Sequence, residues 1–344
     1  MRRAILVITV LIVLAASIAA WLVHARLVEP FKGYTAEEQF VEITPGSSTR
    51  EIGRALVEAG VVRDELVFRI ALWRSGAARR LKAGEYRFDR PMTVADVVDR
   101  IARGDVYLHA ITFPEGLTIR EMARIFETQG FGSAREFLAA AGEVGAIADL
   151  DPGARDLEGY LFPETYALPR RGTAEQLVAM MTSRFRKVLG PQLRQEAEEQ
   201  GLSVRQVVTL ASIVEKETAK ADERPLVAAV CLRRLRIGMP LQSDPTVIYS
   251  LTLAGRYNGN LTRENLQFDS PYNTYRHAGL PPGPIAAPGR TSIEAVVRPA
   301  ESDYLYFVSR NDGSHVFART LEEHNRNVAR YQVGYFRGQR NRVR

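Results

Sequence analysis

The longest uncharged segment of the chain lies at its N-terminus and limits where the rest of the protein can fold. Ala4–Val23 contains 20 residues without a charge, and Arg2 and Arg3 precede it. A helix rises about 1.5 Å per residue, so this run can cross about 30 Å of hydrocarbon. Because positive flanks stay in the cytoplasm, we expect residues 1–3 to be cytoplasmic and residues 4–24 to form a transmembrane anchor.

A cleaved signal peptide is the alternative explanation for this segment. Small residues are frequent in Ala15–Ala20, as they are before a cleavage site. The apolar run exceeds the about 7–15 residues of a signal peptide's central region, which favours a retained anchor. With an anchor, the chain is a single-pass protein of the cell inner membrane whose bulk is periplasmic or otherwise extracytoplasmic.

The composition is that of a folded, arginine-rich protein. The 344 residues are 46% hydrophobic and 25% charged with a net charge of +6, which argues against widespread disorder. Nucleic-acid binding requires a concentrated basic stripe, whereas the charges alternate in sign here except in a basic tail at residues 336–344. We therefore expect no nucleic-acid partner. The single cysteine, Cys231, excludes an intramolecular disulfide and lies in an apolar run typical of a core.

A unit of strand, turn and helix recurs three times between residues 40 and 130. Each copy has a Pro/Gly turn, a threonine as the expected helix N-cap, an acidic residue soon after it and apolar residues at helical spacing. The copies span Ile43–Gly60, Pro91–Gly104 and Thr112–Gly130, with strand candidates at Phe40–Ile43, Gly84–Phe88 and Tyr107–Phe113. Because one such unit cannot bury its apolar face alone, we expect the copies to pack together as one α+β module.

The first two copies and a connecting helix predicted at Asp64–Trp73 resemble LysM-type glycan-binding domains in their strand–threonine–helix pattern. The likeness implies a LysM-like module at residues 40–110 that binds glycan. A polar stalk at residues 25–39 would join it to the anchor. Strand–turn–helix units are also common as purely structural elements, so a module without a ligand is the alternative.

An aromatic and proline-rich segment, Leu157–Pro169, interrupts the helical pattern that begins near Ala134. Its composition is typical of a loop or an edge strand. The aromatics alternate with Glu158 and Glu164, which suits stacking on sugar rings, but a loop packed on a core fits equally well. The sequence leaves these two interpretations open.

The most apolar helix predicted after the N-terminal run ends in two glutamates. Ser203–Lys220 begins with a capping box of Ser203 and Gln206, and apolar residues cover more than half of its circumference. Glu215 and Glu217 both lie inside the apolar arc. Burial disfavours a charged carboxylate and raises its pKa towards about 6–7, which suits a general acid at neutral pH. Pairing with a nearby base is the alternative role, and helical geometry does not choose between the two glutamates.

A second helix is predicted at Pro225–Ile237, because proline favours a first helical turn and Gly238 follows the last. After it, Met239–Ser250 reads as an extended stretch, followed by loops at Arg256–Asn265 and Ser270–Gly289. Disordered linkers carry few aromatics, so segments this rich in tyrosine and asparagine are typical of the wall of a functional site.

Several sequence blocks occur in the order and spacing of the YceG-like endolytic murein transglycosylases. They read ASIVEKET at Ala211–Thr218, LQSDPTVIY at Leu241–Tyr249, YNTY at Tyr272–Tyr275, GLPPGPIAAPG at Gly279–Gly289, YLYFV at Tyr304–Val308 and HNRNVARY at His324–Tyr331. With the anchor and the LysM-like segment, the chain resembles this family over about residues 4–331. The resemblance implies a mixed α+β catalytic domain at residues 111–335.

The resemblance also implies an activity and a catalytic residue. Lytic transglycosylases cut the β-1,4 bond between MurNAc and GlcNAc in peptidoglycan and leave a 1,6-anhydro-MurNAc end. One acid suffices, because the attacking hydroxyl belongs to the same sugar. The family's catalytic glutamate is the second of its EKE block, which corresponds to Glu217. The motif residues matched as substrate contacts, or as groups that orient that acid, are Gln242, Asp244, Tyr249, Asn273 and Tyr275.

No metal and no cofactor is expected. The five histidines lack the spacing of a metal-binding motif, and no Walker loop, GxSxG or dinucleotide fingerprint occurs. The implied partners are peptidoglycan glycan strands and, by family resemblance, peptidoglycan synthases whose nascent strands would be cut. Two alternatives stay open, a hydrolytic muramidase that yields reducing ends and a non-catalytic membrane-anchored scaffold that binds peptidoglycan.

Overall fold

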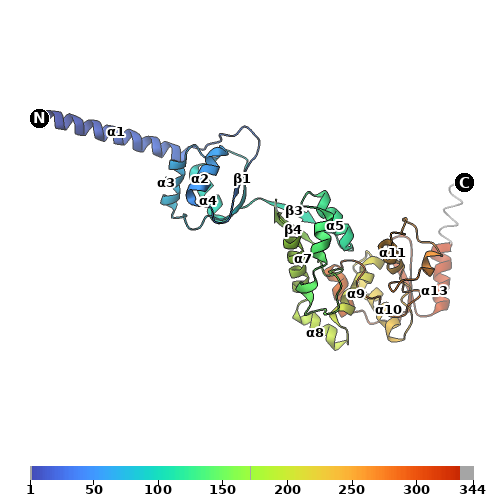
Figure 1. Ribbon diagram of the computed structural model, residues 1–344. Helices are drawn as coiled ribbons and strands as arrows, with labels where there is room; N and C mark the ends of the chain where they lie inside the picture. The colour runs from blue at the N-terminus through green and yellow to red at the C-terminus, as the bar shows by residue number, and fades with distance from the viewer. Residues whose placement is uncertain (1, 171, 334–344) are drawn as a thin grey trace. The chain divides into compact units, whose positions relative to one another are not determined.

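The chain forms mixed helices and strands that divide into two compact units, in agreement with the predicted α+β class. The computed structural model describes residues 2–170 and 172–333 (Figure 1). Unit 1 comprises Met1–Ala110 with Ala167–Arg171, and unit 2 comprises Ile111–Tyr166 with Gly172–Arg344. The predicted basic tail at residues 336–344 lies outside the described residues, as does the end of the predicted catalytic domain.

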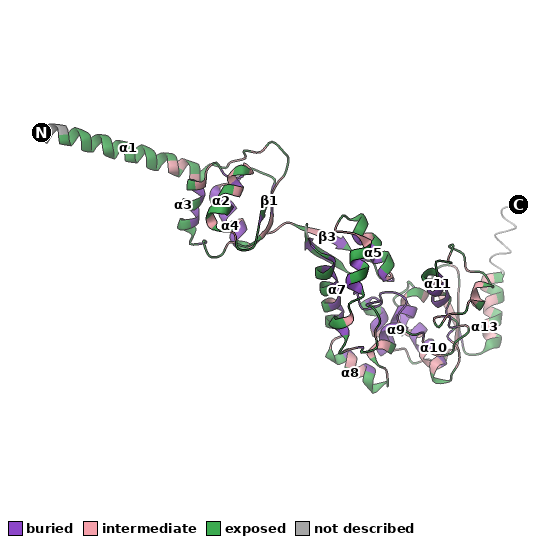
Figure 2. Ribbon diagram, viewed as in Figure 1, coloured by how far each residue is buried: buried purple, intermediate pink, exposed green. Residues whose placement is uncertain are grey.

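The first helix, α1 (Arg2–Val28), contains the uncharged N-terminal run. Its segment Ile5–Val28 has a mean hydropathy of 2.8 and is long and apolar enough to cross a membrane, and none of its most apolar window is buried in the protein (Figure 2). A signal sequence meets the same criteria of length and composition. The helix is therefore compatible with both explanations of this segment.

Unit 1 packs one pair of strands against three short helices. In chain order the elements are β1 (Gln39–Ile43), α2 (Thr49–Glu58), α3 (Glu65–Ser75), β2 (Gly84–Phe88) and α4 (Val94–Arg103). The strands pair antiparallel, with Val41 opposite Tyr86. The core includes Leu56, Phe68 and Ile101, none of which is exposed, and the hydroxyl of buried Tyr86 donates to the carbonyl oxygen of Ile101 over 3.2 Å.

The predicted strands and helix starts of unit 1 are confirmed, with one change of capping residue. Ser48 rather than Thr49 caps α2, and Thr93 caps α4 as expected. Both caps form capping boxes, in which Glu51 and Asp96 accept from the backbone amide of the cap residue. These reciprocal bonds satisfy amides that a free helix end leaves without a partner.

The predicted stalk at residues 25–39 is wrong, because this segment packs on unit 1. Leu27 and Tyr34 lie against its core. The backbone of Phe31 exchanges two hydrogen bonds with that of Met92, of 2.9 and 3.2 Å. Apolar side chains interrupt the polar residues of the segment, and burying them ties the chain down.

The expectation that all three copies of the repeat form one module is also wrong, because the third copy belongs to unit 2. Its strand, β3 (Leu108–Thr112), pairs with β4 (Thr165–Pro169). Its helix, α5 (Ile119–Thr128), packs on α6 (Ala134–Ala141), with the rings of Phe126 and Phe137 5.4 Å apart. The same strand–turn–helix pattern therefore occurs in two units that have separate hydrophobic cores.

Unit 2 is mainly helical, and α9 (Val204–Glu217) lies at its centre. Four helices contact it, namely α8 (Pro191–Glu199), α10 (Arg224–Arg236), α11 (Asp244–Leu253) and α12 (Arg290–Val297). The remaining elements are η1 (Val144–Ile147), α7 (Ala174–Val188), η2 (Asn265–Gln267), β5 (Tyr306–Ser309), β6 (His315–Ala318), α13 (Leu321–Val328) and η3 (Ala329–Val333). Every residue from Val207 to Val214 is buried, as the apolar pattern predicts (Figure 2).

Sequence reasoning about the neighbours of α9 succeeds in part. The predicted second helix is confirmed as α10, and Cys231 is buried within it. The expectation of an extended stretch at Met239–Ser250 is wrong from Asp244 onwards, where α11 begins. Proline at its first turn fixes a helical φ and costs no hydrogen bond there, a signal that the dense polar residues obscured.

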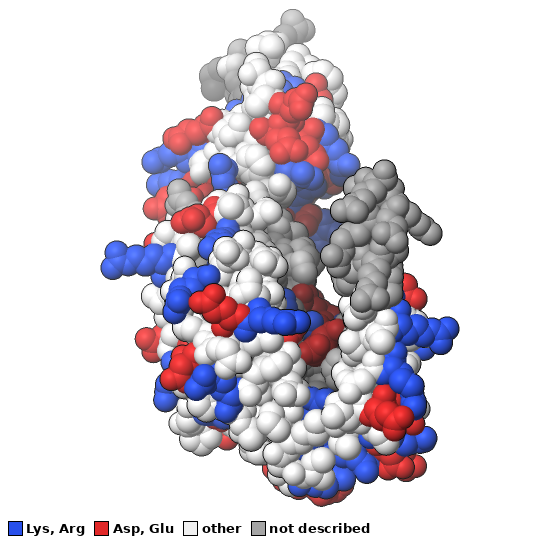
Figure 3. Space-filling model, turned by 90° about the vertical axis from the view of Figure 1, so that its right-hand side faces the viewer, with Lys and Arg blue, Asp and Glu red and all other residues white. Residues whose placement is uncertain are grey.

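The aromatic segment that precedes β4 is a loop packed on the core of unit 2. Leu157, Tyr160, Leu161 and Phe162 are all buried. The rings of Tyr160 and Phe162 therefore face the interior, and the core-packing interpretation holds for them. Acidic and basic side chains alternate on the surface drawn in Figure 3, and no continuous basic stripe crosses that face.

Gly159 in this loop is expected to tolerate no side chain. Its φ is +81°, and an added Cβ would lie 2.5 Å from Pro284 Cβ and 2.9 Å from Val208 Cγ1. Gly159→Ala should lower the free energy of unfolding by about 2–5 kcal/mol, the sum of left-handed strain and overpacking. Chemical denaturation measures this loss.

Gly201→Ala is the matched control, since Gly201 has a φ of +75° but open space around it. It should cost only the about 1–2 kcal/mol of the left-handed backbone. Equal losses in the two variants would show that the contacts of Gly159 do not matter.

Candidate active site

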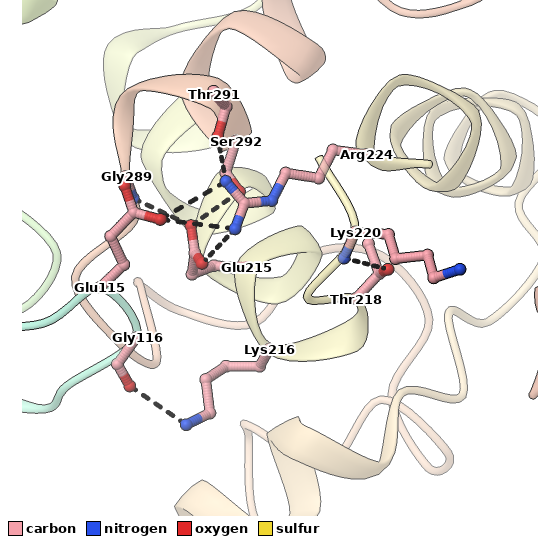
Figure 4. Close-up of polar contacts among 10 residues, drawn as sticks. All are labelled: Glu115, Gly116, Glu215, Lys216, Thr218, Lys220, Arg224, Gly289, Thr291 and Ser292. Atoms are coloured by element: carbon pink, nitrogen blue, oxygen red, sulfur yellow. Dashed lines mark hydrogen bonds and ion pairs between the residues drawn. The ribbon is translucent and has the colours of Figure 1, made fainter. Parts of the chain in front are cut away.

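The two glutamates at the end of α9 lie in different environments, which the sequence could not distinguish. Glu215 accepts three hydrogen bonds: from the Gly289 amide at 3.0 Å, the Ser292 hydroxyl at 2.8 Å and the Arg224 guanidinium at 2.7 Å (Figure 4). Burial raises the pKa of Glu215, and these hydrogen bonds and the positive charge of Arg224 oppose that rise. A carboxylate held by so many donors serves to join α9, α10 and α12.

Arg224 completes this junction. Its side chain is only 7% exposed, and it contacts Glu115 at 3.4 Å and Thr291 as well as Glu215 (Figure 4). The neighbouring residue on α9, Lys216, reaches the other way and donates to the carbonyl oxygen of Gly116 over 3.1 Å. The residues around positions 115 and 116 are therefore bound to the end of α9 through two side chains.

Glu217 receives one side-chain hydrogen bond, donated by the Ser243 hydroxyl to Oε1. The residue is half-buried, so part of it stays accessible. Burial, and to a smaller extent the charge of Asp244, raises the pKa of Glu217, while the Ser243 hydrogen bond and the charge of Arg234 lower it, and the resulting pKa is about 7. A carboxyl group that is protonated in part near neutral pH can both give and take a proton.

Arg234 on α10 shapes the turn that carries Ser243. The guanidinium group is buried and donates to the carbonyl oxygens of Leu241 at 2.8 Å, Pro240 at 3.3 Å and Leu305 at 2.7 Å. A buried cation without a carboxylate partner needs such a cluster of carbonyl dipoles. Arg234 thus fixes the backbone beside Glu217 and places a positive charge near it.

Gln242 lies at the tip of this turn in a strained conformation. Its φ is +53°, in the left-handed region that residues other than glycine rarely adopt. The backbone is held there by a hydrogen bond from its amide to the Thr274 carbonyl oxygen, 3.2 Å long, and its side chain is exposed. Strain of this kind concentrates at functional sites, because the surrounding structure must enforce it.

Two of the predicted site residues form a pair at the start of α11. The Tyr275 hydroxyl donates to Asp244 Oδ1 over 2.6 Å. Asp244 is exposed and Tyr275 is half-buried, so both remain available at the surface. Because Asp244 follows Ser243 directly, this pair lies next to the hydroxyl that contacts Glu217.

Asn273 is brought near the site, where its side chain is engaged in hydrogen bonds. It is fully buried, and its side-chain amide donates to the carbonyl oxygens of Leu266 at 3.0 Å and Phe268 at 2.7 Å. Its side-chain oxygen accepts from the Tyr275 amide at 2.9 Å. Its hydrogen-bonding groups hold the loop that carries Tyr275, and the role matched to Asn273, as a substrate contact or as a group that orients Glu217, stays a prediction.

Tyr249 is not brought to Glu217 and belongs to a second buried cluster. Its hydroxyl donates to Glu158 Oε2 over 3.3 Å, and its ring lies 5.0 Å from that of Tyr272. Glu158 also accepts from the Ile119 amide at 3.1 Å, at the first turn of α5. A cavity of about 110 Å³ adjoins Glu158 and Tyr272. The hydroxyl of Tyr249 is therefore bonded to Glu158, and its role as a substrate contact or as a group that orients Glu217 stays a prediction.

Sequence reasoning missed Ser243 and Arg234. Ser243 stands between two residues that the motif match selected, but a serine before Asp-Pro reads as an ordinary N-cap. Its hydroxyl makes no cap bond and turns to Glu217 instead. Arg234 is one of three arginines in the last turns of α10, and only packing distinguishes it as the buried one.

No group of three metal-ligating side chains is found among residues 2–170 and 172–333. A cavity of about 760 Å³ is lined by α10, by the chain after α12 and by residues around Leu202 and Leu280, and it does not include Glu217.

Glu158 should make stability depend on pH. Burial raises its pKa from 4.5 to about 8, so between these values the folded protein holds a proton that the unfolded chain releases. Stability from this group is complete below pH 4.5 and falls as pH rises to 8, by on the order of 5 kcal/mol. Glu158→Gln, which resembles the protonated acid, should remove this decline in denaturation measured across that range.

Glu164→Gln is the control for losing one acidic side chain from the same loop, since Glu164 is exposed and paired with Arg184 at 2.6 Å. A stability difference between wild type and Glu158→Gln that stays constant from pH 4.5 to pH 8 would contradict the assignment of a buried, protonated Glu158.

Comparison with known proteins relates these residues to one family. The model of the YceG-like family matches residues 41–330. An endolytic murein transglycosylase of Bacillus subtilis is 31% identical over 328 residues, which cover 91% of this chain and 90% of that protein. One from Streptococcus pneumoniae is 34% identical over 323 residues, and the match spans 85% of this chain but 58% of that longer protein.

A solved structure supports the same relationship. A yceG-like protein of Listeria monocytogenes is 33% identical, with a TM-score of 0.57, and the match covers 84% of this chain and 98% of the other. The names of the relatives support peptidoglycan transglycosylase function at the level of the family. Because the family model matches residues 41–330 and the Bacillus subtilis relative is 31% identical over most of both chains, this chain belongs to the YceG-like family.

Proposed function

We propose that this protein is an endolytic lytic transglycosylase that cleaves the MurNAc–GlcNAc β-1,4 bond and leaves 1,6-anhydro-MurNAc ends. The observation that carries the proposal is the state of Glu217, a half-buried carboxyl with a pKa of about 7 and one side-chain hydrogen bond. Glu215, two residues away, is occupied by three donors and has a structural role.

The reaction needs one group that acts twice. Protonated Glu217 gives its proton to the glycosidic oxygen as the bond to C1 breaks. As a carboxylate it then takes the proton from the C6 hydroxyl of the same MurNAc, and that oxygen bonds to C1. A pKa near 7 suits both steps, and the intramolecular hydroxyl replaces the second carboxylate that hydrolysing glycosidases use.

The residues around Glu217 have two different roles in this proposal, one in setting its pKa and one in binding the glycan. Ser243 and Arg234 hold its pKa below the value that burial alone would set. Gln242, Asp244 and Tyr275 are exposed or half-buried beside it, and we assign them to contacts with the glycan. The strained turn at Gln242 keeps its polar side chain outside, where a sugar can reach it.

Unit 1 is proposed to bind glycan as a LysM-like module. Its order of strand, two helices and strand, with β1 and β2 antiparallel, supports this reading. A cavity of about 440 Å³ lies between the end of β1, the turn after it and α2, lined by polar groups that include Thr44, Ser47 and Glu51. Hydroxyls and a carboxylate in a shallow cavity suit the hydroxyls and amides of amino sugars.

Residues 4–24 of α1 are proposed to anchor the protein in the cell inner membrane, with both units outside the cytoplasm. This location would place Glu217 where nascent glycan strands emerge. Cleavage there, beside peptidoglycan synthases, would terminate glycan elongation.

Substitution of each glutamate tests the proposal. Glu217→Gln should lower the rate of glycan-strand cleavage by about 10²–10⁴, since it removes the general acid and base. Mass spectrometry of strands digested by the wild type should show anhydro-muramic ends that are absent with the variant. Glu215→Gln is the matched control and should lose stability more than chemistry.

Other outcomes select the alternatives. Reducing ends in place of anhydro ends would indicate a hydrolytic muramidase, and intact strands bound by the wild type would indicate a scaffold. Full activity of Glu217→Gln with loss in Glu215→Gln would reverse the assignment of the two glutamates.

Ser243→Ala should shift the pH dependence of cleavage. The Ser243 hydrogen bond stabilises the charged form of Glu217, so its loss raises the pKa of Glu217 above about 7. The decline in rate caused by deprotonation should then move to higher pH. Ser250→Ala is the control, because Ser250 is buried in α11 and its hydroxyl bonds only the Val247 carbonyl oxygen, at 2.8 Å. A decline that moves to lower pH would contradict the role given to Ser243.

A further inference from the structure

The outward face of α3 in unit 1 is apolar, although nothing in the described chain covers it. Leu66 is 59% exposed, Trp73 is 82% exposed and Ile70 is half-buried. At about 100° per residue these three side chains form one stripe, opposite the face of α3 whose residues Val67 and Phe68 enter the core. An exposed stripe that includes tryptophan is a contact surface rather than scattered apolar residues.

Arginines surround this stripe. Arg69 and Arg74 lie on either side of it on α3, and Arg79 and Arg80 follow the helix. All four are exposed, and none forms an ion pair within the part of the chain that the structure describes. An apolar stripe flanked by arginine is the pattern of a helix that lies in the interface of an anionic membrane.

The start of α3 is fixed to the end of α1. Arg26 of α1 pairs with Asp64, the N-cap of α3, at 3.2 Å, and Arg63 pairs with Glu29 at 3.1 Å. Leu27 packs against the core of unit 1. Figure 1 shows α3 beside the C-terminal end of α1. The position of Arg26 along α1 therefore predicts how far from the membrane centre α3 begins.

That depth coincides with lipid headgroups if α1 spans the membrane. Arg26 lies three residues after Val23, the last residue of the uncharged run, or about 5 Å further along a helix. The headgroup layer on each side of the hydrocarbon is about 5–7 Å thick. The ion pair of Arg26 with Asp64 thus lies in this layer and brings α3 to it.

We propose that α3 is a second membrane contact, in which Leu66, Ile70 and Trp73 enter the interface and the four arginines bind anionic lipid headgroups. The proposal rests on the membrane anchor proposed above for α1. Tryptophan favours this depth because its ring is apolar and its N–H can still bond to water or phosphate. Arginine binds phosphate with its planar fork of donors. Unit 1 is then held against the membrane by both helices.

The two tryptophans of the chain provide the test, because one lies on each helix. Trp21→Phe leaves Trp73 as the only tryptophan, and Trp73→Phe leaves Trp21. The full-length chain is reconstituted in vesicles of brominated phosphatidylcholine, with and without phosphatidylglycerol, and quenching of fluorescence is measured. In Trp21→Phe, bromines near the headgroup should quench Trp73 more than bromines near the chain end, and phosphatidylglycerol should increase quenching and shift emission to shorter wavelength.

Charge reversal tests the contribution of the arginines. Arg69→Glu with Arg74→Glu, in the Trp21→Phe background, should return the emission of Trp73 to that of a water-exposed ring and abolish its quenching. Arg120→Glu with Arg124→Glu on α5 makes the same change in net charge at exposed residues of unit 2, and it should have no effect.

The two variants separate failure of this inference from failure of the anchor. Quenched Trp21 with unquenched Trp73 in every lipid would overturn the membrane contact of α3 and leave the anchor in place. Unquenched Trp21 would overturn the anchor and, with it, the basis of this inference. Quenching of Trp73 that the charge reversals leave unchanged would overturn the role of the arginines.

Discussion

The buried ion pair between Glu215 and Arg224 is the interaction on which the candidate site depends. Removing two charges from water is costly, and the structure compensates with further donors from Gly289 and Ser292 on the same carboxylate. The pair joins α9, α10 and α12 at one point. It fixes the direction in which α9 ends, and hence the position of Glu217 two residues later. A glutamate that joins three helices thereby lies two residues from the one that we propose as the general acid and base.

A second buried cation, Arg234, explains how Glu217 acquires its surroundings. Among residues 2–170 and 172–333 it forms no ion pair with a carboxylate, and it binds backbone carbonyls, which holds the turn at Gln242 and Ser243 against the end of α9. The left-handed Gln242 is a local cost of this arrangement. With the turn held in this way, Ser243 faces Glu217, and the positive charge of Arg234 limits the rise in the pKa of Glu217 that burial causes. The same side chain therefore serves structure and acidity.

In the N-terminal part, side-chain contacts also hold one element in place, because they attach unit 1 to the end of α1. The segment after α1 packs on unit 1, and two ion pairs bind the end of α1 to the start of α3. A long flexible stalk would allow unit 1 to move away from a membrane, whereas this attachment holds it at the end of the helix. If the proposals for both units hold, the chain binds lipid, glycan and the scissile bond through three separate surfaces.

The sequence by itself determined the features that are encoded by the spacing of apolar residues and by the capping and turn residues at the ends of elements. These are the apolar N-terminal helix, the strands at 40–43 and 84–88, the capped helices and the burial of α9. Motif order led to the family, and through it to Glu217. Only the tertiary structure showed that Glu215 and Glu217 have different surroundings, placed Tyr249 beside Glu158, and revealed the contacts of Ser243 and Arg234. Local pattern reports which face of an element is buried, but the pKa and role of a side chain depend on groups supplied by segments far away in sequence.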